Sequence, residues 1–246
     1  MPSLKPEILF SFSGINISNT ILGTIVVDLI LIYIIYSVRK NFKIHPQGLQ
    51  NIFEFILEYL YSLTQQIAGS RAVSIFPWFA SFFIFILFAN LVGLLPGFGS
   101  IGIFKNLNGE HEFIPLLRAA TSDFNTTFAL ATISLVATHA LSIKYNGIKD
   151  YLKRFFSFNP IFLFVGILEL IGEITKLISL SFRLFGNIYA GEVVLSTISS
   201  LFAFVAPVPF LMLETIVALV QALVFSMLTM AFMSILTTSH SEGGEH

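Results

Sequence analysis

The chain has 246 residues, of which 55% are hydrophobic and only 11% are charged, and its formal net charge is −1. Soluble domains carry about 25% charged residues, so this composition excludes an ordinary soluble domain and predicts a polytopic membrane protein. The sequence contains no cysteine, which excludes disulfides, thiol catalysis and thiolate metal sites.

The N-terminal third combines one apolar segment with one amphipathic segment. Residues 1–18 lack a basic region and a small-residue cleavage site, and are predicted to be a retained tail rather than a signal peptide. A membrane span needs about 20 mostly apolar residues. Residues 20–38 meet this requirement despite one acid, Asp28, whose role the sequence leaves open. Residues 47–70 repeat apolar and polar residues at helical spacing, which predicts an amphipathic helix in the interface.

Two further spans follow in the middle of the chain. Residues 77–95 are the second apolar segment, and a polar loop at 96–121 separates them from a third span at 122–143. Ser122 or Asp123 is the expected N-cap of the third span, because short polar side chains accept hydrogen bonds from the first free N–H groups of a helix.

The C-terminal third is one long apolar region that two prolines divide. Pro207 and Pro209 cannot both lie inside a continuous helix, so the region separates into residues 161–206 and 208–238. The first part has 46 residues. It would be about 69 Å long as a helix, against a hydrocarbon core of about 30 Å. We therefore expect a steeply tilted helix, in preference to one broken at an internal glycine.

These segments predict an all-α, polytopic membrane protein with a single integral membrane domain over residues 1–246. It has about five membrane-crossing helices, one interfacial amphipathic helix and a long, strongly tilted C-terminal helical hairpin. The orientation follows from Lys and Arg, which are enriched in cytoplasmic loops. Segments 39–76 and 144–160 carry four each, whereas 1–19 and 96–121 carry one and two. The N-terminus is therefore expected outside and the C-terminus inside.

A stripe of polar residues runs along the first helix of the hairpin. Glu169, Glu173, Lys176, Arg183 and Asn187 all lie within about 40° of one direction at 100° per residue. Arg183 is a permanent cation with no acid three or four residues away, whereas Glu173 and Lys176 are spaced to form an internal salt bridge. Ionisable groups inside a membrane usually mark an ion path. All five are candidate path residues, with the salt bridge left open as the alternative for Glu173 and Lys176.

Three other polar residues, one on the same helix and two on the last helix, are expected near the membrane depth of Arg183. Glu192 falls on the opposite face of the same helix, while Glu214 and Gln221 share one face of the last helix. In an antiparallel hairpin Arg183 is expected level with Gln221, and Glu192 level with Glu214. We predict a direct contact between Arg183 and Gln221, and a water-filled path lined by the two acids.

Four blocks of the sequence, in this order, resemble subunit a of the F-type ATP synthases. They are FANLVGLLPG at 88–97, TSDFNTTFALA at 121–131, SFRLFGNIYAGE at 181–192 and LETIVALVQALVFSMLT at 213–229. The resemblance implies that Arg183 is the stator charge facing the carboxylates of a rotating c ring. It also implies that a set of polar residues lines two half-channels: Asn90, Glu169, Ser179, Asn187, Glu192, Glu214 and Gln221. Some members of the family have His at the position of Glu214.

The expected function is that of a proton-translocating stator subunit. Its expected partners are the c ring, subunit b of the peripheral stalk, the other ATP synthase subunits and the lipid bilayer, with no nucleic acid. The chain has no GxxxxGK[ST] or HExxH motif, so we expect no nucleotide chemistry, cofactor or metal in it. The alternatives are an independent ion channel or secondary transporter, and a purely structural anchor.

The sequence leaves several properties open. The expected location is a bacterial plasma membrane, with the mitochondrial inner membrane as the alternative. The coupling ion, proton or sodium, is not fixed by this chain. His139 lies alone near the inner end of its span, and a structural role is the simpler interpretation.

Overall fold

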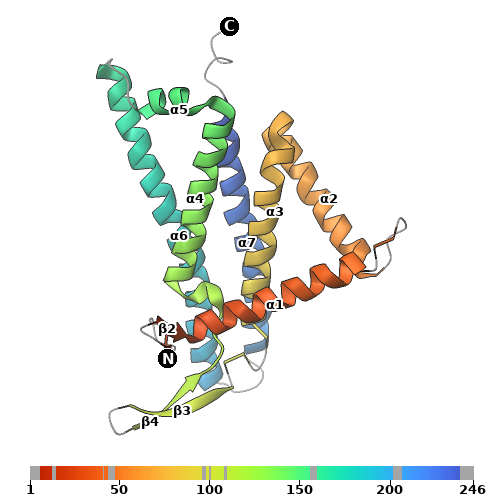
Figure 1. Ribbon diagram of the computed structural model, residues 1–246. Helices are drawn as coiled ribbons and strands as arrows, with labels where there is room; N and C mark the ends of the chain where they lie inside the picture. Colours follow the sequence, from red (N-terminus) through yellow and green to blue (C-terminus); the bar gives the residue numbers. More distant parts are fainter. Residues whose placement is uncertain are drawn as a thin grey trace.

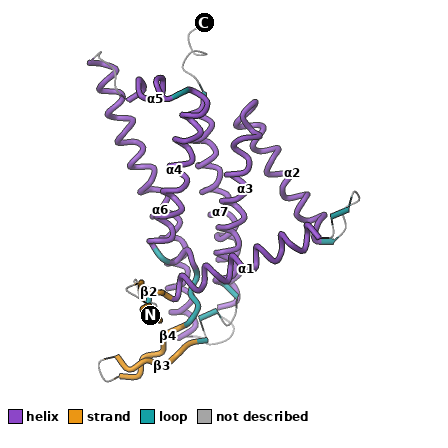
Figure 2. The backbone as a smooth tube through the Cα atoms, viewed as in Figure 1, coloured by secondary structure: helices purple, strands orange, loops and turns teal. Residues whose placement is uncertain are grey.

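The computed structural model describes residues 6–12, 15–40, 42–43, 48–95, 98–99, 101–107, 110–155, 160–201 and 207–238. Most of these residues are helical, which confirms the all-α class. The helices are α1 (Asn19–Lys40), α2 (Leu49–Ala68), α3 (Ala72–Gly93), α4 (Phe124–Asn146), α5 (Ile148–Phe155), α6 (Pro160–Leu201) and α7 (Pro207–Thr237). Figure 1 shows their arrangement and Figure 2 separates helices from strands and loops.

Two short antiparallel hairpins occur where the sequence predicted a tail and a loop. Strand β1 (Ile8–Phe12) pairs with β2 (Ile15–Ser18), and β3 (Gly102–Leu107) pairs with β4 (Glu110–Pro115). A two-stranded hairpin satisfies its backbone groups locally and needs no long apolar run, so a search for membrane spans does not detect it. Both hairpins lie at the same end of the molecule, which we call the β-hairpin end (Figure 1).

The bundle that positions the polar residues consists of α3, α4, α6 and α7. Helix α7 packs against α3 and α4, and α4 also packs against α6. The core contains fully buried apolar side chains from each of these helices, among them Phe79, Ala131, Leu184, Phe225 and Met230. α7 supplies small residues as well as large ones to this core, which lets its backbone approach its neighbours closely.

Helix α6 is continuous over 42 residues, about 63 Å at helical rise. It has no break at Gly166, Gly172, Gly186 or Gly191, so the unbroken helix expected at 161–206 is confirmed as far as Leu201, and residues 202–206 lie outside the described residues. In Figure 1, α6 runs diagonally from the end that carries α5, the α5 end, to the β-hairpin end. α7 returns beside it to complete the hairpin.

By length and composition, four stretches of the described residues could cross a membrane: Asn19–Lys40, Gln50–Gly93, Phe124–Asn146 and Pro207–Thr237. α6 is not among them. It carries five charged residues, Glu169, Glu173, Lys176, Arg183 and Glu192, which lower its hydropathy. The chain is therefore confirmed as a polytopic membrane protein by helices other than α6, the helix that carries the polar stripe.

The ends of two predicted spans differ from the observed helices. α3 begins at Ala72 and contains Pro77, where the prediction placed its start. A proline near the start of a helix removes only one backbone hydrogen bond. α4 begins after Asp123, whose carboxylate accepts the Asn125 N–H at 2.9 Å, so Asp123 is the N-cap. α4 continues to Asn146 and ends at Gly147, which has a positive φ of 79°.

The amphipathic segment forms α2 and packs against α3 and α7. Gln50, Leu60, Thr64 and Ala68 supply its buried positions. α1 crosses the lower half of Figure 1 at a steep angle to α3, α4 and α7, and α2 continues from it to the upper end. Asp28 on α1 is exposed.

The N-terminal strands and the β3–β4 hairpin lie at one end of the molecule, and α5 lies at the other (Figure 1). These two ends are predicted to face opposite sides of the membrane. In sealed vesicles, cysteines placed at exposed Ile101 and exposed Lys149 are therefore expected to react with an impermeant maleimide from opposite sides, 101 from outside and 149 from inside. Fully buried Ile86→Cys is the unreactive control. Labelling of position 101 only from the cytoplasmic side would reverse the topology.

Candidate functional site

The polar side chains around α6 form three groups along its length. The α5-end cluster comprises Tyr151, His139, Glu173 and Lys176. The central group comprises Arg183, Asn187 and Gln221. The β-hairpin-end cluster comprises Asn90, Arg118, Thr121, Glu192 and Glu214.

In the central group, Arg183 lies on an exposed face of α6. Among the described residues it makes no hydrogen bond or ion pair. The amide of Asn187, one turn further along, donates to Gln221 Oε1 at 2.7 Å, and Gln221 is buried. The predicted Arg183–Gln221 contact is therefore wrong, because the Arg183 side chain lies on an exposed face and Gln221 accepts from Asn187 instead. The guanidinium is left available to another molecule.

Small side chains surround Arg183 on this face. Ser179, Gly186 and Ala190 are all exposed, and they lie four residues before it and three and seven residues after it. A Cβ added at Gly186 would meet no neighbouring atom within 4 Å. A partner could therefore approach the guanidinium closely without displacing a bulky side chain of this helix.

The register of the hairpin can be tested by disulfide trapping. We expect Asn187→Cys with Gln221→Cys to crosslink readily, because these side chains are in contact across the α6–α7 interface. Arg183→Cys with Gln221→Cys should crosslink more slowly, since the Arg183 side chain points to an exposed face. Both double variants are compared on gels after mild oxidation, in a chain that has no native cysteine. Faster trapping of 183 with 221 would contradict the observed rotation of α6.

At the β-hairpin end, Arg118 Nη2 lies 3.1 Å from Glu192 Oε2. The Arg118 side chain is 5% exposed and that of Glu192 is 31% exposed. In the sequence Arg118 is one of two basic residues of the 96–121 loop, and this ion pair was not predicted. No local signal could have found it, because the partners are 74 residues apart.

The second acid of this cluster, Glu214, is buried against the backbone of Gly191. A Cβ added at Gly191 would overlap the Glu214 carboxyl group. This contact confirms that Glu214 lies at the depth predicted for the Glu192 region. Glu192 itself pairs with Arg118, so the two acids have different neighbours.

Asn90 links three elements of the same cluster. It is buried, its Oδ1 accepts the Thr121 hydroxyl at 2.6 Å, and its amide donates to the Ala218 carbonyl at 3.4 Å. Thr121 lies in the short 3₁₀ helix η2 (Ala120–Ser122) that precedes α4. The β-hairpin end therefore holds a polar network within reach of α3, η2, α6 and α7.

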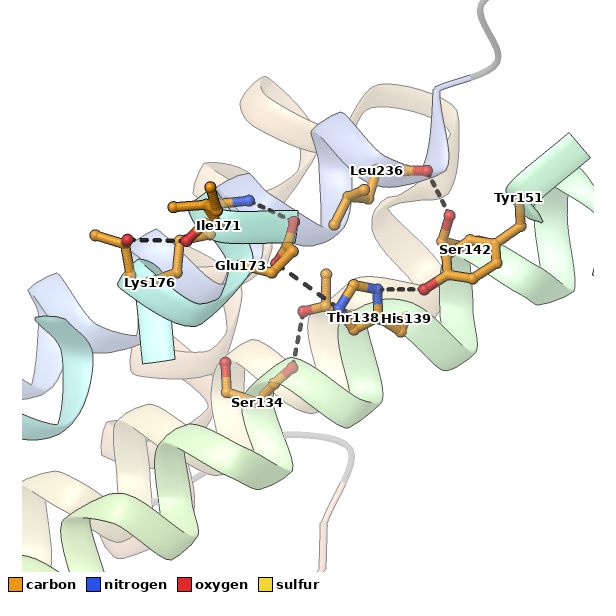
Figure 3. Close-up of polar contacts among 10 residues, drawn as sticks. Ser134, Thr138, His139, Ser142, Tyr151, Ile171, Glu173, Lys176 and Leu236 are labelled. Atoms are coloured by element: carbon orange, nitrogen blue, oxygen red, sulfur yellow. Dashed lines mark hydrogen bonds and ion pairs between the residues drawn. The ribbon is translucent and has the colours of Figure 1, made fainter. Parts of the chain in front are cut away.

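At the α5 end, the salt bridge that the sequence left open is present. Lys176 Nζ lies 2.7 Å from Glu173 Oε1. Glu173 Oε2 lies 3.7 Å from His139 Nε2, and the other ring nitrogen of His139 lies 3.0 Å from the Tyr151 hydroxyl (Figure 3). The predicted stripe is thus divided by burial: Glu173 is buried, Glu169 and Lys176 are partly buried, and Arg183 and Asn187 are exposed.

The geometry gives two polar clusters near opposite ends of α6 and a permanent cation between them. Carboxyl, imidazole and hydroxyl groups can pass protons through water, whereas a guanidinium cannot be neutralised and repels cations. Within the described part of the chain, no three side chains are placed to hold a metal ion. The arrangement can therefore separate two proton paths.

Comparison with known proteins gives one family model and several relatives that share one name. A family model described as ATP synthase A chain matches residues 20–234. A Syntrophobacter fumaroxidans protein named ATP synthase subunit a is 34% identical over 231 residues, covering 92% of this chain and 87% of that protein. Proteins with the same name are 29% identical over 240 residues in Moorella thermoacetica, covering 98% of this chain and 100% of that protein, and 32% identical over 219 residues in Trichlorobacter lovleyi, covering 87% and 85%.

Proposed function

Because the chain belongs to the ATP synthase A chain family, we propose that it is the stator of the membrane motor. Its two polar clusters are the proposed half-channels, one leading to a ring of c subunits and one leading away from it. As an integral membrane protein of this family it takes part in proton transport and ATP synthesis. The finer assignment concerns which of its residues carry the proton.

The observation that carries the proposal is the position of Arg183. It is an exposed cation, without a partner among the described residues, one helical turn from the Asn187–Gln221 amide pair and between the two clusters. An ionised carboxylate of the ring would be attracted to it, and a protonated carboxyl would not. Each ring carboxylate therefore releases its proton before it passes Arg183 and takes up another after it.

The β-hairpin-end cluster is the proposed outer half-channel. Glu214, Glu192 and Asn90 are its polar groups, and Arg118 holds Glu192 in place. The α5-end cluster of Glu173 and Lys176, with Glu169 before it and Ser179 after it on α6, belongs to the inner half-channel. Arg183 separates the two, so that a proton crosses the membrane only by way of the rotating ring.

The proposed partners are the c ring, subunit b of the peripheral stalk and the remaining ATP synthase subunits, all within a lipid bilayer. The proposed location is a bacterial plasma membrane, with the N-terminus outside and the C-terminus in the cytoplasm. The rival assignment is an independent ion channel or secondary transporter. Such a protein conducts without partners, whereas a stator conducts only beside a ring.

Copurification tests the proposal. A tagged chain, extracted in mild detergent from its own host, should bring with it a c ring and the peripheral stalk. The purified chain alone, reconstituted in liposomes, should leave proton permeability at the level of empty liposomes. Steady conduction by the isolated chain, with no ring attached, would favour the channel or transporter.

A further inference from the structure

A row of three titratable side chains connects the surface at the α5 end to the interior of the bundle. Its members come from three helices: Tyr151 from α5, His139 from α4 and Glu173 from α6 (Figure 3). The Tyr151 hydroxyl lies 3.0 Å from His139 Nδ1, and His139 Nε2 lies 3.7 Å from Glu173 Oε2. One nitrogen of the imidazole is therefore within hydrogen-bond distance of the surface helix, and the other faces the Glu173 carboxylate in the interior.

Burial increases from His139 to Glu173. The side chain of His139 is 21% exposed and that of Glu173 is 7% exposed. A cavity of about 10 Å³, close to the size that holds one water molecule, lies on the interior side of Glu173. Its polar lining comes from Ser134, Thr138, Glu173 and Lys176, and its lining on α6 continues through Leu177 to Leu180, toward Arg183.

The charges around the imidazole are accounted for on each described helix packed against it. α6 presents Glu173, which is itself paired with Lys176 at 2.7 Å. α5 presents the Tyr151 hydroxyl, while the side chain of Asp150 is exposed. On α4 itself, Lys144 is exposed, one and a half turns further along. α7 also packs against α4, and its charged residue, Glu214, belongs to the β-hairpin-end cluster. Among these groups, the Glu173 carboxylate is the one that lies within 4 Å of the ring.

We infer that His139 and Glu173 form the inner exit of the proton path, with His139 exchanging protons with the inner aqueous phase. This inference rests on the proposed stator function and adds a residue for which the sequence favoured a structural role. An imidazole can gain and lose a proton near neutral pH, which no other side chain of this cluster does at its ordinary pKa.

In the outward-to-inward direction, the step transfers one proton from Glu173 to His139. The O–H bond of the protonated Glu173 carboxyl breaks and an N–H bond forms at Nε2, leaving a carboxylate beside Lys176 and an imidazolium. The imidazolium then gives one proton to water at the α5 surface and returns to the neutral ring. A shift of about 1 Å brings the 3.7 Å separation into hydrogen-bond range. Proton uptake from the inside is the reverse sequence.

The test begins with inverted vesicles that contain the complete complex. Passive proton conduction is measured after the catalytic part has been removed, so that only the membrane part titrates. Glu173→Gln and His139→Gln should each lower conduction roughly tenfold or more, on the low side of the about 10²-fold effect of a positioned acid–base group. The double variant should be no slower than the slower single variant, because both residues act on one path.

Three further readouts separate a proton-exchange role from a structural one. The decline of wild-type proton uptake between external pH of about 6 and about 8 should disappear in His139→Gln. Added imidazole should restore conduction in His139→Ala. Tyr151→Phe should alter the pH profile, whereas Tyr145→Phe should not, because the Tyr145 hydroxyl contacts Ser74 outside the cluster.

Arg183→Ala is measured in parallel, in inverted vesicles that retain the catalytic part and can pump protons with ATP, so that failure of the inference can be told from failure of the stator proposal. Full pumping by Arg183→Ala would reject the stator function itself. Loss of pumping in Arg183→Ala, with normal conduction and an unchanged pH profile in Glu173→Gln and His139→Gln, would reject only the inner exit. Loss of complex assembly in both Gln variants would make the cluster structural and would also overturn the inference.

Discussion

Replacement of Arg183 by alanine is expected to reduce ATP-driven proton pumping to background while the complex still assembles. The guanidinium makes no hydrogen bond or ion pair with the described residues, so its loss removes no internal support from the fold. What is lost is the fixed positive charge between the two clusters. Pumping is measured as acidification of inverted vesicles, and assembly as copurification of the ring.

Loss of the charge should also open a passive proton leak, since nothing then separates the two half-channels. Lysine should substitute poorly, because an ammonium is a point charge that can lose its proton when buried, unlike the planar guanidinium. Arg39→Ala is the matched control, since Arg39 is an exposed arginine at the end of α1. Coupled pumping at the wild-type rate by Arg183→Ala would end the stator assignment.

Replacement of Gly191 by alanine is expected to slow proton flux about tenfold, as expected for a displaced acid–base group. A methyl group at this position overlaps the Glu214 carboxyl, so the carboxyl must move from its buried site. The substitution should not weaken α6, because alanine is about 1 kcal/mol more favourable than glycine inside a helix. The loss of flux would therefore report on Glu214 rather than on helix stability.

Two comparisons make this prediction specific. Glu214→Asp combined with Gly191→Ala should recover part of the flux, because the shorter side chain leaves room for the added methyl group. Gly172→Ala, at a position where an added Cβ meets nothing within 4 Å, should pump as the wild type does. Equal rates for Gly191→Ala and the wild type would remove Glu214 from the outer path.

The sequence by itself was sufficient for features that depend on spacing along one helix. An unbroken α6 was predicted, Asp123 was one of two predicted caps, and the Glu173–Lys176 pair was one of two interpretations of these residues. Each follows from the 3.6-residue period or from the chemistry of a helix end. The absence of an acid three or four residues from Arg183 is also local information of this kind.

Contacts between helices were decided only by the tertiary structure. Arg118 meets Glu192, His139 meets Glu173, and Gln221 accepts from Asn187 instead of Arg183. Each depends on how far a helix is rotated about its axis and on which neighbours pack beside it. Membrane helices are apolar on nearly all faces, so hydrophobic periodicity gives little information about that rotation. Close packing of side chains such as Phe225 and Leu184 determines it instead, and thereby decides which polar groups meet.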